Sequence, residues 1–157
     1  MKRLLMLVAL LATALPVVAE PIDPADIRVV DGDTIQVYGM QPNVRLVGFD
    51  APETWHPDCE PERALGFKAT ARLKALVRAG YLDFEYVRCS CPESKLGTQW
   101  CNYGRDCGLL RSNGRNVGDI LIAEGLAVPF ICGPTSCPKK PHPWCPVNLP
   151  TSVNPAR

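Results

Sequence analysis

The sequence predicts a β-rich α+β fold with a hairpin-rich sheet, two packed helices and an irregular C-terminal tail. Three observations support this prediction. Short β-branched runs alternate with turn residues early in the chain, two later stretches carry apolar residues at helical spacing, and the last residues are rich in cysteine and proline. The chain has 157 residues, which suits one domain with a hydrophobic core.

Three strands are predicted near the start of the domain. Apolar, β-rich runs occupy residues 27–30, 34–38 and 44–49. Asp31-Gly32 and residues 39–43 separate these runs and contain the residue types that favour tight turns. Because short turns join neighbouring antiparallel strands, we expect the three runs to form hairpins of one sheet.

The rest of the domain is predicted to add two helices and two strands. Apolar residues recur at helical spacing over residues 62–79, and Gly80 ends that helix. Residues 82–87 alternate apolar and acidic side chains, as a half-buried strand does, and a further strand is expected at 107–111. A shorter second helix is predicted at 117–126.

The two ends of the chain differ in composition from the domain between them. Residues 1–19 begin with Lys2 and Arg3, continue as an apolar run and finish with small residues, a pattern typical of a secretory signal peptide. An uncleaved anchor is the alternative, but the run is shorter than the ~20 apolar residues that span a bilayer. We therefore expect a secreted or periplasmic protein without stable membrane insertion. The folded domain would occupy residues 20–131 and a Cys/Pro-rich tail residues 132–157.

The net charge argues against a protein that holds nucleic acid by bulk attraction. The chain has 17 basic and 16 acidic residues and a net charge of +1. Loss of Lys2 and Arg3 with the signal peptide leaves 15 basic against 16 acidic residues, a net charge of −1. Binding of a polyanion must then depend on local arginines or on a bound cation. We expect the mature chain to be a monomer.

Eight cysteines are many for a chain of this size. With an export signal, an even number favours disulfides, and the lack of C-x-x-C pairs makes zinc the minor alternative. Two bonds are expected among four cysteines that flank a predicted hairpin, namely Cys89, Cys91, Cys101 and Cys107. The other two bonds are expected between Cys137 and Cys145 and between Cys59 and Cys132.

Two aspartates fall at neighbouring strand ends and suggest a cation site. Asp33 precedes the run at 34–38, and Asp50 follows the run at 44–49. Antiparallel pairing would place the two carboxylates side by side, where they repel each other unless a cation lies between them. Hard oxygen ligands favour Ca²⁺ or Mg²⁺, and the backbone carbonyl of Ala51 could add a third oxygen. Taken alone, Asp33 could instead belong to a polar hairpin turn.

Arg45 and Glu53 turn this pair of aspartates into a candidate catalytic site. Arg45 lies on the strand that leads to Asp50, and Glu53 follows Asp50 closely. Phosphodiester hydrolysis needs a positioned water and positive charge near the phosphate. The carboxylate of Glu53 can orient and activate the water, and the planar guanidinium of Arg45 can bind phosphate oxygens.

The residues around this site closely resemble those of a known family. The stretch VVDGDTIQV, the stretch VRLVGFDAPETWHP that follows it, and the later ERALGFKATARLKALV, NYGRDCG and NGRNVGDILIAEGLAV are similar to the staphylococcal nuclease (thermonuclease) family. The likeness is to an exported bacterial member and covers roughly residues 27–131. D-G-D-T together with R-L-x-G-x-D-A-P-E at this spacing is specific, whereas D-G-D-T alone is not.

The resemblance implies a fold, a reaction and a set of site residues. The fold is a five-stranded OB-fold barrel with packed helices. The reaction is Ca²⁺-dependent cleavage of DNA and RNA that leaves 3′-phosphate ends. The implied residues are the metal ligands Asp33, Asp50 and the Ala51 carbonyl, the catalytic residues Arg45, Glu53 and Arg105, and the substrate-binding Tyr103.

Three departures from the family pattern concern the metal, the substrate and the tail. Ala51 replaces a threonine, a change that keeps the carbonyl ligand. Phe130 and Ile131 stand where the family has a nucleotide-contacting tyrosine, so we expect weaker nucleotide binding. The Cys/Pro-rich tail replaces the last helix of the family, and Trp144 could cover the barrel in its place.

Two alternative functions are compatible with the sequence. OB-type barrels can bind single-stranded nucleic acid or oligosaccharides without catalysis. A nuclease-like protein can also serve bacterial exopolysaccharide (succinoglycan) biosynthesis. The presence of both Arg45 and Glu53 favours the nuclease over the binding module.

Overall fold

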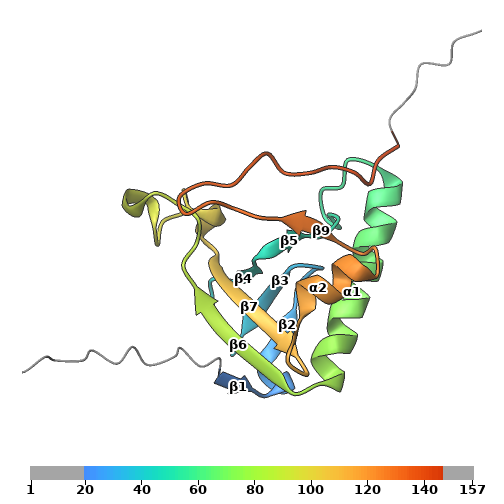
Figure 1. Cartoon of the computed structure of the whole chain (residues 1–157), viewed down its shortest axis with the longest axis horizontal. Helices are drawn as coiled ribbons and strands as arrows, with labels where there is room; N and C mark the ends of the chain where they lie inside the picture. The colour runs from blue at the N-terminus through green and yellow to red at the C-terminus, as the bar shows by residue number, and fades with distance from the viewer. Residues whose placement is uncertain (1–19, 147–157) are drawn as a thin grey trace, which may run out of the picture.

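A strongly curled sheet, flanked by one long and one short helix, forms the body of the protein (Figure 1). The computed structural model describes residues 20–146. The predicted signal peptide at 1–19 and the tail residues 147–157 lie outside the described residues. Within them, the prediction of a β-rich α+β fold is confirmed.

The described residues form nine strands in two sheets. The main sheet has the order β1-β6-β7-β4-β3-β2, with β8 paired to β7, and β5 and β9 form a second sheet. β4 and β7 run parallel, whereas the other pairs are antiparallel. The strands are β1 (Glu20–Ile22), β2 (Ile27–Val29), β3 (Thr34–Val37), β4 (Val44–Leu46), β5 (Gly48–Asp50), β6 (Leu82–Val87), β7 (Asp106–Ser112), β8 (Arg115–Asn116) and β9 (Val128–Phe130).

The strand order fits an OB-like sheet. β2, β3, β4, β7 and β6 occupy consecutive positions, and the sheet curls into a half-barrel (Figure 1). A closed barrel would also need β2 to pair with β6, and no ladder joins these two strands within residues 20–146. The fold is therefore OB-like, while the exact five-stranded barrel is not confirmed.

The single strand predicted at 44–49 is wrong, because the structure divides it in two. β4 ends at Leu46 and β5 begins at Gly48, whose φ of 96° lies in the region that favours glycine. β4 pairs with β3 and β7, whereas β5 pairs with β9. The change of partner places Asp50 opposite Val128, on the strand that leads into the tail.

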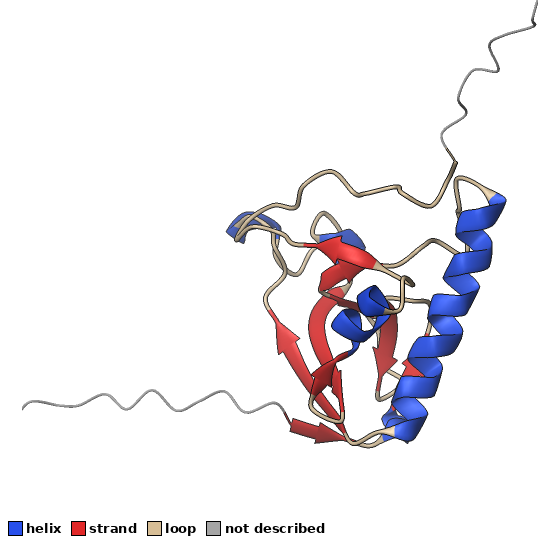
Figure 2. Ribbon diagram, turned by 45° about the vertical axis from the view of Figure 1, so that its right-hand side comes forward, coloured by secondary structure: helices blue, strands red, loops and turns tan. Residues whose placement is uncertain are grey.

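Two helices cover one side of the curled sheet. α1 (Glu60–Ala79) extends along its whole height, and α2 (Val117–Ala123) packs beside α1 (Figure 2). The helix predicted at 117–126 ends earlier, because Gly125 with a φ of 70° cannot continue it. The buried face of α1 includes Leu73 and Val77 and closes the hydrophobic core. Among the described residues, no helix is both long enough and apolar enough to cross a membrane.

Four disulfides connect all eight cysteines. Cys89–Cys107 and Cys91–Cys101 confirm the expected bonds around the hairpin of β6 and β7. Several such bonds are typical of proteins that fold outside the reducing cytoplasm.

The two tail disulfides differ from the expected pairs, so that prediction was wrong. The bonds are Cys132–Cys137 and Cys59–Cys145. The chain turns back directly after Cys132, where the N–H of Gly133 donates to the carbonyl of Ser136 at 2.8 Å. The tail then crosses to the start of α1 and is fastened there by Cys59 (Figure 1).

We expect the two tail disulfides to stabilise the fold by different amounts. The Cys59–Cys145 bond closes a separation of 86 residues, whereas Cys132–Cys137 closes one of 5. Loop-closure entropy then predicts a loss of about 4–5 kcal/mol for Cys59→Ser/Cys145→Ser and about 2 kcal/mol for Cys132→Ser/Cys137→Ser. Denaturant unfolding of the oxidised proteins measures both free energies, and equal losses would contradict the expectation.

Candidate active site

Two buried aspartates and one arginine form the centre of the site. Asp33 directly precedes β3 and Asp50 ends β5, and both side chains are buried. Arg45 lies on β4, opposite Thr34 in the register. Its Nη2 lies 2.8 Å from Asp33 Oδ2 and 2.6 Å from Asp50 Oδ1. The structure thus brings together three residues that the sequence singled out.

The two aspartates differ in how their oxygens are satisfied. Asp33 Oδ2 accepts a hydrogen bond from the backbone N–H of Ala51 at 2.8 Å, and Asp33 Oδ1 accepts one from Thr34 Oγ1 at 3.2 Å. Asp50 Oδ2 is buried and has no hydrogen-bond partner among the described residues. A buried carboxylate oxygen without a partner costs free energy, so Asp50 has an unused ligand position.

These donors fit a hard divalent cation. Asp33 and Asp50 offer carboxylate oxygens, one of them unpartnered, and Ala51 follows them with a backbone carbonyl. Carboxylate and carbonyl oxygens are the ligands that Ca²⁺ and Mg²⁺ take, with water completing the set. The residues present therefore suit the kind of ion that the resemblance implies.

Burial leaves both carboxylates in an unfavourable electrostatic environment. Burial is the largest effect on Asp33 and raises its pKa to about 6, although the nearby Arg45 lowers it. Burial also raises the pKa of Asp50, against the opposite effects of Lys140 and Arg45. The folded protein accordingly holds negative charge where neutral or cation-bound carboxyl groups would be more stable.

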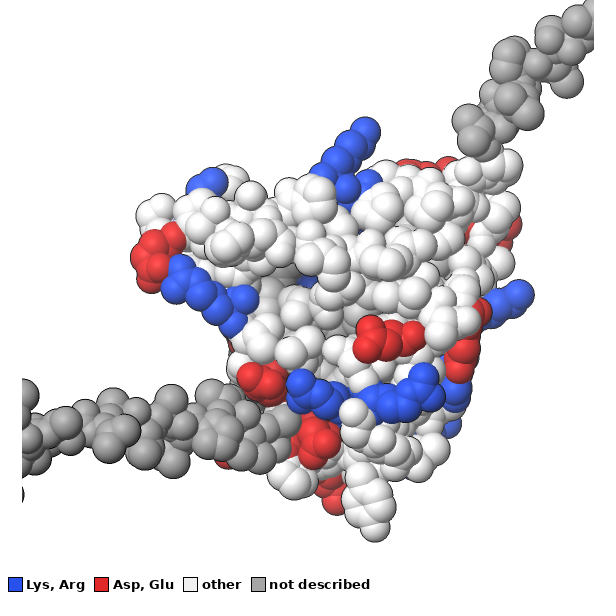
Figure 3. Space-filling view, in the orientation of Figure 1, with Lys and Arg blue, Asp and Glu red and all other residues white. Residues whose placement is uncertain are grey.

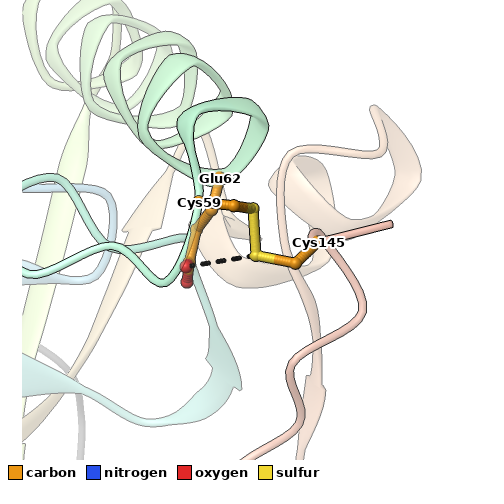
Figure 4. A group of neighbouring side chains, drawn as sticks. All are labelled: Cys59, Glu62 and Cys145. Atoms are coloured by element: carbon orange, nitrogen blue, oxygen red, sulfur yellow. Dashed lines mark hydrogen bonds between the residues drawn. A yellow bond between two sulfur atoms is a disulfide. The ribbon is translucent and has the colours of Figure 1, made fainter. Parts of the chain in front are cut away.

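A second group of potential ligands lies at the start of α1 and is not a metal site. Cys59, Glu62 and Cys145 have ligand atoms within 4.8 Å of one another (Figure 4). The two sulfurs are bonded to each other at 2.05 Å, so neither is available as a thiolate. Glu62 instead accepts backbone N–H groups of the preceding loop. This group therefore has a structural role.

The loop that carries Glu53 rests on the first turns of α1. The buried Glu62 accepts hydrogen bonds from the backbone N–H groups of Asp58 at 2.6 Å and Glu53 at 3.4 Å. A Cβ at Gly66 would lie only 2.7 Å from the carbonyl oxygen of Pro52. Sequence reasoning missed both residues. A glutamate in the first turn of a helix was the available signal for Glu62.

A lysine from the tail also lies in the site, and no pattern in the sequence indicated it. Lys140 Nζ lies 2.6 Å from Glu53 Oε1 and 3.3 Å from Asp50 Oδ1. Its side chain is 32% exposed. The ammonium group therefore bridges a predicted catalytic carboxylate and a predicted metal ligand.

Arg105 reaches the site from the segment that directly precedes β7. Its Nη1 donates to Thr34 Oγ1 at 3.4 Å, and its Nε donates to the carbonyl of Asn102 at 3.1 Å. Burial lowers its pKa, and the nearby Arg45 lowers it further. The exposed ring of Tyr103 lies 5.7 Å from the guanidinium carbon of Arg105. The aromatic ring and the cation are thus presented together.

An open groove connects these groups. It has a volume of about 1020 Å³, and the charged and aromatic side chains on its wall include Arg45, Glu53, Tyr103, Arg105 and Lys140. The buried aspartates do not line the groove themselves. They contact two side chains that do, Arg45 and Lys140. Such a groove can admit an extended anionic chain and expose it to water, carboxylate and guanidinium groups at once.

Two bacterial proteins show similarity to the chain. Endonuclease YncB of Bacillus subtilis (strain 168) is 34% identical over 102 residues, which cover 64% of this chain and 44% of that protein. The SPbeta prophage-derived endonuclease YokF of the same organism is 35% identical over 102 residues, covering 64% of this chain and 31% of that protein. Both are named endonucleases. The chain spans less than half the length of these curated relatives, and no family model matches it.

We expect the Asp33 carboxyl group to weaken the fold at neutral pH. Its pKa is about 6 in the folded protein against 3.8 for the free side chain. Because the folded-state value is raised, the charged form destabilises the fold, and this destabilisation is lost as the pH falls from 7 to 4. Asp33→Asn should therefore raise the free energy of unfolding by about 2–3 kcal/mol at pH 7 and change it little at pH 4.

Denaturant unfolding at both pH values, in the presence of a chelator, measures this difference. Asp106→Asn is the control, because Asp106 is exposed. An Asp33→Asn protein that is equally stable to the parent at pH 7 would contradict the expectation.

Proposed function

We propose that the protein is an exported, Ca²⁺-dependent nuclease that hydrolyses phosphodiester bonds of DNA and RNA and leaves 3′-phosphate ends. One observation carries the proposal: Arg45 and Glu53 line one open groove, and Arg45 contacts the buried carboxylates of Asp33 and Asp50 behind it. The similarity to two proteins named endonucleases supports it. The four disulfides support an exported location.

The proposed role of Glu53 is to hold and deprotonate the attacking water. Its side chain is 41% exposed and faces the groove, so that water can reach it. Its carboxylate accepts a proton as the water oxygen bonds to phosphorus. The bond between phosphorus and the 5′ oxygen breaks, and that oxygen takes up a proton from solvent.

The proposed role of Arg45 and Arg105 is to stabilise the negative charge on the phosphate oxygens. Within the described residues, every polar contact of Arg45 is made through Nη2. Its Nε and Nη1 hydrogens are therefore available to a phosphate. A divalent cation held by Asp33, Asp50 and the Ala51 carbonyl would add further positive charge beside the same phosphate. Tyr103 is proposed to lie along the bound nucleotide.

The surface supports recognition by specific groups rather than by bulk charge. On the face that Figure 3 draws, basic and acidic side chains alternate, and a short band of basic side chains is flanked by acidic ones. With 17 basic and 16 acidic residues in the chain, attraction of the substrate depends mainly on the cations of the groove itself. This dependence favours a metal-assisted enzyme over a module that only binds nucleic acid.

Removal of divalent metal should abolish cleavage. The oxidised protein is incubated with single-stranded DNA and with RNA, in Ca²⁺ or in excess chelator, and products are resolved with their ends analysed. We expect cleavage with 3′-phosphate ends in Ca²⁺ only, because without the cation the site lacks the positive charge that would polarise the phosphate and hold the attacking water. Cleavage that persists in chelator would contradict the mechanism, and binding without cleavage would favour the binding module.

Glu53→Gln should lower the cleavage rate by about 10²–10⁴-fold, because an amide cannot accept the proton of the water. Glu60→Gln is the matched control, since Glu60 is a highly exposed glutamate at the start of α1. Both variants should unfold at the same denaturant concentration as the parent. A Glu53→Gln protein with the parent rate would remove Glu53 from the mechanism.

A further inference from the structure

Two disulfides hold the tail segment that places Lys140 in the site. The tail is closed on itself by Cys132–Cys137 and fastened to the start of α1 by Cys59–Cys145, and Lys140 lies between these two bonds. Pro138 and Pro141 flank the pair Lys139-Lys140 and restrict the backbone there. The segment is thus held at both ends and stiffened in the middle.

The neighbouring lysine shows that the placement is specific. Lys139 is exposed, whereas Lys140 is partly buried and bridges Glu53 and Asp50. Both its contacts are to carboxylates, at 2.6 and 3.3 Å. An ammonium group is a compact cation, so at this position it supplies part of the positive charge that a bound metal ion would supply.

We propose that Lys140 is an internal cation that competes with the divalent metal for the carboxylates of the site. Asp50 Oδ1 contacts both Arg45 and Lys140, so a divalent cation on the unpartnered Oδ2 of the same carboxylate would lie beside two positive groups that repel it. Arg45 is anchored on β4 in the sheet, whereas Lys140 comes from a surface segment. Lys140 is therefore the partner that leaves. This inference rests on the proposed function, because it assumes that the carboxylates bind metal.

The competition has a definite effect on affinity. The carboxylates bind metal only while Lys140 is away from them. The apparent dissociation constant for the metal therefore equals the intrinsic one divided by the fraction of time for which the carboxylates are free of Lys140. If the ammonium group occupies the carboxylates for nine-tenths of the time, the apparent affinity falls by about tenfold. The tail then sets the metal concentration at which the site fills.

The test is a calorimetric titration of Ca²⁺ into the oxidised mature protein and three variants. We expect Lys140→Gln to bind Ca²⁺ about tenfold more tightly than the parent. Lys139→Gln is the matched control, since it removes the same charge one residue away and should leave the affinity nearly unchanged. Cys59→Ser/Cys145→Ser, which frees the tail from α1, should shift the affinity in the same direction as Lys140→Gln.

Each other outcome has a distinct meaning. If Lys140→Gln binds Ca²⁺ with the parent affinity or more weakly, the competition is excluded, even where cleavage still requires Ca²⁺. If that variant instead raises the KM for DNA at saturating Ca²⁺ with an unchanged metal affinity, Lys140 is a phosphate-binding residue and the inference is wrong. If neither the parent nor the variants bind a divalent cation and none cleaves, the proposed function itself fails.

Discussion

The burial of Asp33 and Asp50 beside one guanidinium is the constraint on which the site depends. β3, β4 and β5 bring the three side chains together, because the register of β3 and β4 and the break at Gly48 fix where each side chain lies. Two carboxylates and one arginine leave negative charge inside the protein, and every further cation near the groove is placed to offset it. The fold thus places Arg45 and Lys140 against the buried carboxylates, where their positive charges partly offset the negative charge at the groove.

The sequence predicted the local features of the fold well. Hairpin runs, the helix up to Ala79 and the strand at 82–87 follow from periodicity and turn residues over a few positions, and the structure contains them all. The division of the predicted strand at Gly48 could not be predicted, because it depends on the pairing of β5 with β9, a strand that is distant in the sequence. The short second helix ended where a positive φ at Gly125 outweighed the apolar pattern.

The candidate site was predictable to the extent that its residues lie close in sequence. Asp33 precedes β3 and Arg45 lies on its partner β4, while Asp50 follows Arg45 by only five residues, so one strand pairing and a short chain segment bring the three together. Glu62 and Lys140 were missed because their roles arise from tertiary contacts. A lysine in a proline-rich tail looks like any solvated lysine until the disulfide from Cys145 to Cys59 fixes the path of the tail.

The fastening of the tail to α1 also sets an order of events in biosynthesis. The ribosome delivers the chain from its N-terminus, so the acidic residues between Asp33 and Glu53 are available before Lys140 and Cys145 emerge. The last partner of the site arrives only when an oxidising compartment joins Cys145 to Cys59 across 86 residues. The charge balance in the groove is thus tied to disulfide formation, and a chain held under reducing conditions would carry its carboxylates without the lysine held against them.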